Sequence, residues 1–348
     1  TLHRVERVET DPKKLTDQLM VDYDGDDSPG AAVQVWRDGR TVYSKAYGMA
    51  NLAYGIPFEV DTRTNIGSTS KQFTAFAIML QADRGLLSLD DDIREHIPEL
   101  PDFGPTVTIR NLLNHTSGYR EVYNLMPLTG YQGEDALRRD HVIEIVRRQP
   151  ELQAPPNTEF NYNNTGFILL ATTIERVSGM TFPEYMKERV FGPLGMVDTR
   201  VKAYQGEIIP GSAQGYVPVE SGGVRSTRDL AASYGAGGIY TTVEDLTRWM
   251  LNYRDATLGG EEAINAITAK PILADGDTSS YGLGLGIGEM RGRTLYSHTG
   301  GDVAHRAYLS YYPELQSGVI LMSNHGSFDL GLGGRIASVF FEDRFETE

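Results

Sequence analysis

The chain has 348 residues, enough for one large domain or two lobes around a sizeable hydrophobic core. Its formal net charge of -15 and its isoelectric point of about 4.9 argue against nucleic acid or an anionic membrane surface as a partner. The absence of cysteine excludes thiol nucleophiles, disulfides and cysteine-based zinc sites.

No stretch approaches the roughly 20 consecutive apolar residues of a membrane-spanning helix, so no transmembrane segment is predicted. The sequence begins with Thr1 rather than methionine, which is compatible with a targeting segment removed from its start. We therefore expect an exported protein, periplasmic or extracellular, and keep a cytoplasmic location as the alternative.

The first predicted elements are an amphipathic helix around residues 13–23 and a strand pair at 31–36 and 41–47. An Asp-Gly dipeptide, Asp38-Gly39, lies between these two β-rich runs, which is typical of a hairpin. The pattern then becomes helical. Helices are predicted at 68–85, 109–114, 134–149, 167–177, from the capping box at 181–184, and at 242–253. Residues 201–235 are predicted to be loops.

Strands return in the last part of the chain, at 281–287, 294–297, 306–312 and 318–323, and a final amphipathic helix follows at 330–341. Strands at both ends with helices between them predict an α+β fold. We expect an antiparallel sheet built from the N- and C-terminal segments and flanked by helices, with a mostly helical lobe inserted. Residues 1–66 and 236–348 would form the α/β lobe, residues 67–235 the helical lobe, and the active site the cleft between them.

Ser68 and Lys71 stand three positions apart at the start of a strongly apolar helix. Side chains at i and i+3 share a helix face, so the ammonium can reach the hydroxyl. A serine hydroxyl is a weak nucleophile until a base activates it, and a partly desolvated lysine can be that base. The alternative is a Ser/Thr-rich helix start followed by a chance lysine.

Two further clusters could complete such a site. In the first, Tyr162 near an ammonium could have a lowered pKa and relay protons, while Asn164 holds the lysine or a substrate carbonyl. The second, residues 297–301, ends a predicted strand whose small residues would let a substrate backbone pair alongside; there the N–H of Gly301 could share an oxyanion with that of Ser68. The alternatives are a loop with a packed tyrosine and a strand followed by a glycine turn.

Together the three clusters resemble the serine hydrolases related to class C β-lactamases, which include DD-carboxypeptidases, D-aminopeptidases and β-lactamase-fold esterases. That family carries Ser-x-x-Lys, Tyr-x-Asn and Lys/His-Thr-Gly in this order. Here the three motifs are Ser68/Lys71, Tyr162/Asn164 and His298-Thr299-Gly300. Flanking phrases at 108–118, 191–196 and 235–245 match as well, so the resemblance covers about residues 30–325.

The resemblance implies a two-step acyl transfer without a cofactor. Ser68 would attack a carbonyl, Lys71 and Tyr162 would serve as base and proton relay, and the N–H groups of Ser68 and Gly301 would bind the oxyanion. Asn164 and His298 complete the expected catalytic set, and Thr299, Gly300 and Arg306 are expected to bind substrate. Which of Lys71 and Tyr162 takes the first proton is left open.

The sequence departs from efficient class C β-lactamases, which carry lysine where His298 stands. Histidine there resembles the DD-peptidase and D-aminopeptidase branches, and with an ordinary pKa near 6.5 it is largely neutral at pH 7. Weak or no β-lactamase activity is therefore expected. Arg306 could restore a positive charge for a substrate carboxylate, or it could be a surface strand residue.

The other histidines can be interpreted without a catalytic role. A dyad of Ser117 and His115 is set aside because residues two apart on a turn rarely face each other. His305 and His325 could border the cleft, with surface positions as the alternative. The absence of cysteine and of a spaced His/Asp cluster argues against a catalytic metal.

The hypothesis is thus a metal-free serine hydrolase of amide or ester bonds. Its expected substrate is a small molecule or short peptide, and a D-amino-acid peptidase is favoured. The alternatives are an esterase for short acyl chains and a penicillin-binding sensor domain that is acylated without turnover.

Overall fold

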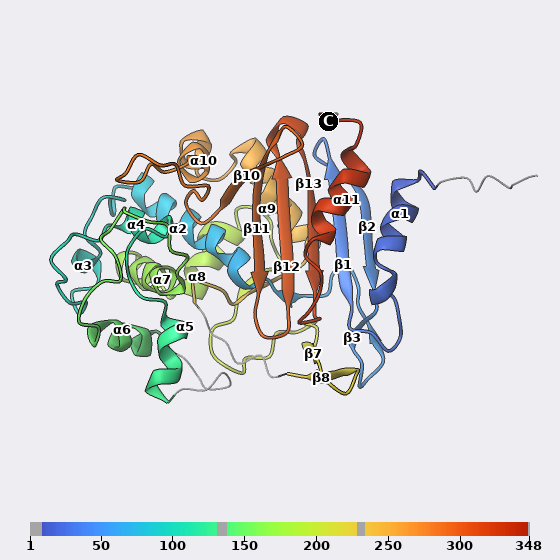
Figure 1. The fold of residues 1–348 in the computed structure, drawn as a ribbon, viewed down its shortest axis with the longest axis horizontal. Coiled ribbons are helices and arrows are strands. Elements are labelled where there is room, and N and C mark those ends of the chain that lie inside the picture. The colour runs from blue at the N-terminus through green and yellow to red at the C-terminus, as the bar shows by residue number, and fades with distance from the viewer. Residues whose placement is uncertain (1–8, 131–137, 228–233, 347–348) are drawn as a thin grey trace, which may run out of the picture.

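A six-stranded antiparallel sheet is the main element of the computed structural model, which describes residues 9–130, 138–227 and 234–346. The strand order is β10-β11-β12-β13-β1-β2, so strands from both ends of the chain share one sheet (Figure 1). The strands are β1 (Ala31–Arg37), β2 (Arg40–Tyr47), β10 (Gly286–Met290), β11 (Arg293–Gly301), β12 (Arg306–Tyr312) and β13 (Ser317–Ser323). The predicted fold class is confirmed.

Helices cover both faces of this sheet because its central strands are apolar on both sides. Successive side chains of a strand point to opposite faces. In β1, Val33 and Val35 pack with α11 (Leu332–Phe341), against which α1 (Pro12–Leu19) also lies. Ala32 and Trp36 belong to the larger core on the opposite face, where α9 (Val243–Asp255) packs (Figure 1).

The remaining helices gather beside the sheet around α2 (Lys71–Asp83), which is buried along most of its length and packs against α7 (Asn164–Ser178). The others are α3 (Ile93–His96), α4 (Ile109–Leu113), α5 (Val122–Leu125), α6 (Arg139–Arg147), α8 (Phe182–Met186) and α10 (Gly260–Thr268). The short strands are β3 (Met49–Asn51), β4 (Ile56–Pro57), β5 (Thr64–Asn65), β6 (Arg200–Val201), β7 (Tyr216–Pro218), β8 (Val224–Ser226) and β9 (Ile239–Thr241).

Strands β5 and β9 pair beside the two predicted lobe boundaries, and β6 joins them from within the predicted helical lobe. The division into lobes at those boundaries remains a prediction. Within the described residues, no helix has the length and apolar character needed to cross a membrane.

Several predicted elements differ from the observed ones. Ser68 lies in a 3₁₀ turn, Gly67–Ser70, and the α-helix begins only at Lys71. The start of the helix predicted at 134–149 falls partly outside the described residues, and α10 was not predicted. The strand predicted at 281–287 begins only at Gly286, because its glycines allow the chain to pass close to helices. A Cβ on Gly282 would lie 2.2 Å from the carbonyl oxygen of Ile267, at the end of α10.

A substitution at Gly300 tests how tightly the sheet packs against the turn that carries Ser68. An alanine Cβ there would lie 1.8 Å from the carbonyl oxygen of Ile66, a backbone atom that cannot move aside cheaply. We expect Gly300→Ala to lower the free energy of unfolding by about 1–3 kcal/mol, measured by urea denaturation. The matched control is Gly288→Ala in β10, where nothing lies within 4 Å of the new Cβ. Equal stability of the two variants would contradict the close packing.

Candidate active site

Ser68 and Lys71 are joined by a hydrogen bond. Ser68 lies in the 3₁₀ turn and Lys71 is the first residue of α2, so the rigid buried helix fixes their relative position. The Nζ of Lys71 donates to the Oγ of Ser68 over 3.1 Å. The nucleophile predicted from the spacing of the two residues therefore has a nitrogen base within direct reach.

Lys71 is fully buried, with 0% of its surface exposed. Its Nζ also donates to Oδ1 of Asn164 over 2.7 Å and to the carbonyl oxygen of Ala236 over 3.0 Å. Burial lowers the pKa of Lys71 to about 7, and the negative charge of Glu121 partly opposes this shift. Near neutral pH a substantial fraction of this amine is therefore uncharged and able to accept a proton.

Tyr162 lies on the other side of Ser68 and forms a hydrogen bond with its side chain. Burial raises the pKa of Tyr162 above its ordinary value, and the bond to Ser68 only partly counters this. The expectation of a lowered pKa is therefore wrong. The negative charge of Glu121 also disfavours a phenolate and raises the pKa of Tyr162 further. The Nζ of Lys71 lies over the ring face, 4.8 Å from its centroid.

Glu121 is a site residue that the sequence analysis did not find. Its carboxylate caps α5 by accepting from the N–H of Tyr123. It also accepts from the backbone N–H of Asn164 and, over 3.0 Å, from Nδ2 of the same residue. Because a carboxylate only accepts, it turns the amide so that Oδ1 of Asn164 faces Lys71. Glu121 follows the His-Thr-Ser-Gly phrase but belongs to no motif of its own.

The third cluster lies on an open strand edge. Strand β10 pairs with β11 only from Arg293 to Ser297, whereas residues 298–301 pair with β12 alone. Their other edge is left free of a strand in the described part of the chain. An extended substrate backbone could therefore pair there, as the small residues of this segment predicted.

His298 is held in a neutral form by its surroundings. Its Nε2 lies 2.8 Å from the hydroxyl of Tyr281, a second site residue that the sequence analysis missed. Burial and the nearby charge of Lys71 lower the pKa of His298 to about 4. The imidazole is therefore neutral at pH 7 and supplies a hydrogen-bonding group rather than a fixed cation.

Gly301 lies directly against the turn that precedes the nucleophile. A Cβ on Gly67 would be 2.3 Å from the backbone nitrogen of Gly301, so only glycine fits at position 67, where φ is also +49°. This contact brings the segment that carries the Gly301 amide against the residue that precedes Ser68. The two backbone N–H groups expected to bind an oxyanion therefore belong to touching segments.

A cavity of about 500 Å³ opens above these residues. It is lined by Ser68, Tyr162, Tyr281, Gly286, Ser297, His298, Thr299, Gly300, Gly301, Arg306 and Leu330. Lys71 and Asn164 are not among the lining residues; Lys71 contacts Ser68, and Asn164 contacts Lys71. Arg306 is the one charged residue in this lining, and its role toward a substrate carboxylate stays a prediction.

Of the other histidines considered in the sequence, none lines this cavity. His115 is buried, and it holds the tyrosine segment from both sides: its carbonyl accepts from Asn161 and its Nδ1 accepts from Asn163. The Nδ1 of His115 is bonded to Asn163 and its Nε2 has no hydrogen-bond partner in the part of the chain that the structure describes, so no dyad of His115 and Ser117 forms. His325 accepts from the N–H of Ser327. Within the described residues no group of three or more His, Asp or Glu side chains could hold a metal ion.

An antiparallel sheet flanked by helices, with a serine and a buried lysine at the start of a central helix, defines the class of serine β-lactamase-fold proteins. The family model described as Beta-lactamase matches residues 15–335. The chain belongs to that family, and the resemblance found in the sequence is confirmed.

Two relatives at about 30% identity are named as a D-aminopeptidase and a penicillin-binding protein. A D-aminopeptidase of Cereibacter sphaeroides is 30% identical over 85% of this chain and 57% of its own length. Penicillin-binding protein 4* of Bacillus subtilis is 30% identical over 82% of this chain and 66% of its own. The chain thus spans little more than half of the D-aminopeptidase. Among solved structures, an octameric penicillin-binding protein homologue from Pyrococcus abyssi has a TM-score of 0.80 at 26% identity, covering 95% of this chain and 77% of that one.

The pKa of Lys71 makes a prediction about Ser68 reactivity. If the neutral amine activates Ser68, labelling of Ser68 by a fluorophosphonate should accelerate as the pH rises through about 7. Glu121→Gln removes the negative charge that favours the ammonium, so the pKa of Lys71 should fall and the acidic limb should move to lower pH. The measurement is the labelling rate between pH 5 and 9. Glu151→Gln, an exposed partner of Arg120, is the control and should leave the limb unmoved.

Proposed function

We propose that this chain is a serine hydrolase of amide and ester bonds that forms an acyl-enzyme on Ser68 and acts on small amides or short peptides of D-amino acids. The observation that carries the proposal is the contact between Ser68 and a fully buried lysine whose pKa lies near 7. The D-aminopeptidase and penicillin-binding relatives support the D-amino-acid substrate class.

In the proposed first step, the Oγ of Ser68 attacks the carbonyl carbon and its proton passes to Lys71. Lys71 is assigned this role because its amine is partly neutral at pH 7, whereas the raised pKa of Tyr162 keeps the phenol protonated. The hydroxyl of Tyr162, bonded to Ser68, then relays a proton to the departing amine or alkoxide while Lys71 returns one to Tyr162. Water attacks the ester by the reverse route and frees Ser68.

The N–H groups of Ser68 and Gly301 are proposed to stabilise the tetrahedral oxyanion. A donor of this kind contributes typically about 3–4 kcal/mol to the transition state. Asn164 is proposed to keep Lys71 aligned, and the open edge at 298–301, with Thr299 and Gly300, to pair with the substrate backbone. The neutral His298 provides no fixed cation for a β-lactam carboxylate, which supports weak or no β-lactamase activity.

A second candidate function, an esterase for short acyl groups, is favoured by one observation. Tyr162 and Tyr281 line the cavity and Phe160 beside them is exposed, so the site offers aromatic surface to an apolar substrate. A penicillin-binding sensor that is acylated without turnover is the third candidate. The exported location stays a prediction.

The nucleophile is tested by Ser68→Ala. We expect the variant to lose all turnover and all covalent labelling, because no second serine lies beside a base in the cavity as Ser68 does. The assay is a panel of D-Ala-D-Ala peptides, D-amino-acid amides, p-nitrophenyl esters and nitrocefin, with the intact mass recorded after each incubation. A mass shift without product would support the sensor. Labelling of the variant would identify another nucleophile and contradict the proposal.

Arg306 should decide whether the site prefers a substrate carboxylate. Charge-assisted hydrogen bonds contribute about 1.5–3 kcal/mol, so we expect Arg306→Gln to lower kcat/KM at least tenfold for a peptide with a free C-terminal carboxylate. The same peptide as a C-terminal amide should lose much less. Comparing the two substrates in one variant removes any general structural effect. An equal loss of kcat/KM on both peptides would show that Arg306 does not bind the substrate carboxylate.

A further inference from the structure

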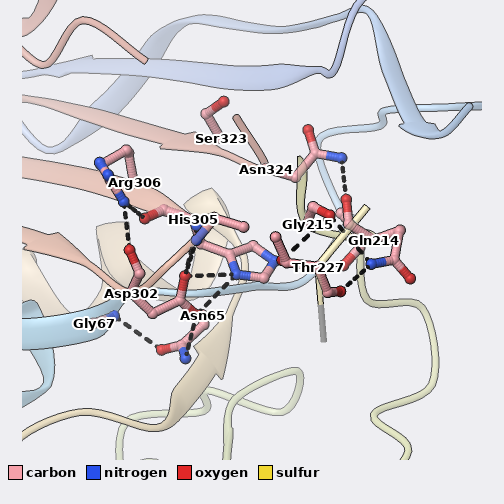
Figure 2. Close-up of polar contacts among 12 residues, drawn as sticks. Asn65, Gly67, Gln214, Gly215, Thr227, Asp302, His305, Arg306, Ser323 and Asn324 are labelled. Atoms are coloured by element: carbon pink, nitrogen blue, oxygen red, sulfur yellow. Dashed lines mark hydrogen bonds and ion pairs between the residues drawn. The ribbon is translucent and has the colours of Figure 1, made fainter. Parts of the chain in front are cut away.

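A chain of polar side chains, the buried Asn65 and the largely buried Asp302, connects the two segments proposed to form the oxyanion hole (Figure 2). It begins at Asn65, in β5, whose Oδ1 accepts from the backbone N–H of Gly67 over 2.9 Å. The Nδ2 of the same amide donates to Oδ2 of Asp302 over 2.9 Å. Gly67 immediately precedes Ser68, and Asp302 immediately follows Gly301, so the chain ends beside both proposed oxyanion donors.

Asp302 is the centre of this chain, with 13% of its side chain exposed. Its Oδ1 accepts from the backbone N–H groups of Ala304 and His305 over 2.7 and 2.6 Å. Its Oδ2 lies 2.9 Å from Nδ1 of His305, whose side chain is almost fully buried. These hydrogen bonds and His305 outweigh the effect of burial and lower the pKa of Asp302 to about 2, so the carboxylate stays ionised at working pH.

The guanidinium of Arg306 also binds the backbone of the loop at residues 302–305. One guanidinium nitrogen donates to the carbonyl oxygens of Asp302 and His305 over 2.6 and 2.8 Å (Figure 2). The backbones of Gly67 and Gly301 touch directly, as described above. Asn65, Gly67, Gly301 and Asp302 therefore form a closed ring of four links. Two links are hydrogen bonds of the Asn65 amide, one is the close backbone approach of Gly67 and Gly301, and one is the peptide bond between Gly301 and Asp302.

We propose that Asp302 is a positioning residue that acts through Asn65 to set the spacing between the N–H groups of Ser68 and Gly301. The inference rests on the proposed hydrolase function. An oxyanion donor is effective only within about 2.7–3.1 Å of the developing charge. A misplacement of about 1 Å can lower the rate on the order of 100-fold. Asp302 has no contact with the nucleophile and is not among the residues that line the cavity, so its effect on the reaction is indirect.

The proposal can be tested by exchanging the amide of Asn65 and the carboxylate of Asp302 between the two positions. In Asp302→Asn an amide NH₂ in the Oδ2 position would face the NH₂ of Asn65, and two donors cannot pair. In Asn65→Asp two carboxylates would face each other. In the double variant Asp302→Asn/Asn65→Asp a donor again faces an acceptor, and the second oxygen of the new Asp still accepts from Gly67. We expect kcat for p-nitrophenyl acetate to fall at least tenfold in each single variant, with KM within about threefold, and to recover in the double variant.

The control is Asp245→Asn in α9. Asp245 is a fully buried carboxylate that accepts from a backbone N–H and a hydroxyl, those of Asp198 and Thr199. This variant should have a lower melting temperature and an unchanged kcat.

The outcomes separate the inference from the function on which it rests. A wild-type protein that neither hydrolyses the ester nor reacts with a fluorophosphonate overturns the proposed function, and the inference with it. An active wild type whose Asp302→Asn variant keeps kcat within twofold overturns the inference alone. A slow single variant that the double variant does not restore also overturns it, because the loss then comes from general destabilisation.

Discussion

The burial of one ammonium group is the constraint on which the rest of the site depends. Lys71 begins an apolar helix and has no route to water, so its charge must be met by protein oxygens. Those oxygens belong to Asn164 and Ala236, and this need brings three distant segments together around Ser68. The folded-state pKa of about 7 lies below the ordinary 10.5, so the unfolded chain binds more protons between these values. Folding stability from this group therefore rises with pH through that window.

The second constraint is the point in the sheet at which the pairing between β10 and β11 ends. Strand β10 covers only the first half of β11, and the chain before it passes close to α2 through glycines. A Cβ on Gly284 would lie 2.8 Å from the carbonyl oxygen of Lys71. The same close approach that seats the lysine helix thus keeps β10 short and leaves residues 298–301 available to a substrate.

Local rules in the sequence predicted much of this fold. The capping box at Thr181, the Asp38-Gly39 hairpin and the spacing of Ser68 and Lys71 all act within a few residues, and the structure contains each of them. Glu121, Tyr281 and Asp302 belong to no predicted motif. Their partners in the site, Asn164, His298 and Asn65, lie 43, 17 and 237 positions away. The direction of the Tyr162 pKa shift depended on burial, which spacing does not encode. Helix α10 has Gly259 as its N-cap and Gly260 as its first residue, and glycine does not signal a helix start in the sequence.

The two carboxylates that the sequence analysis missed have the same physical role: each hydrogen-bonds an asparagine amide. An asparagine amide can be turned either way, because its oxygen and nitrogen have nearly the same shape. A carboxylate can only accept, so it fixes the NH₂ group and leaves the oxygen for one chosen donor. Glu121 fixes Asn164 so that its oxygen receives Lys71, and Asp302 fixes Asn65 so that its oxygen receives the N–H of Gly67. Each carboxylate thereby determines which way a hydrogen-bonding group points beside the nucleophile, and neither needs to touch the substrate to do so.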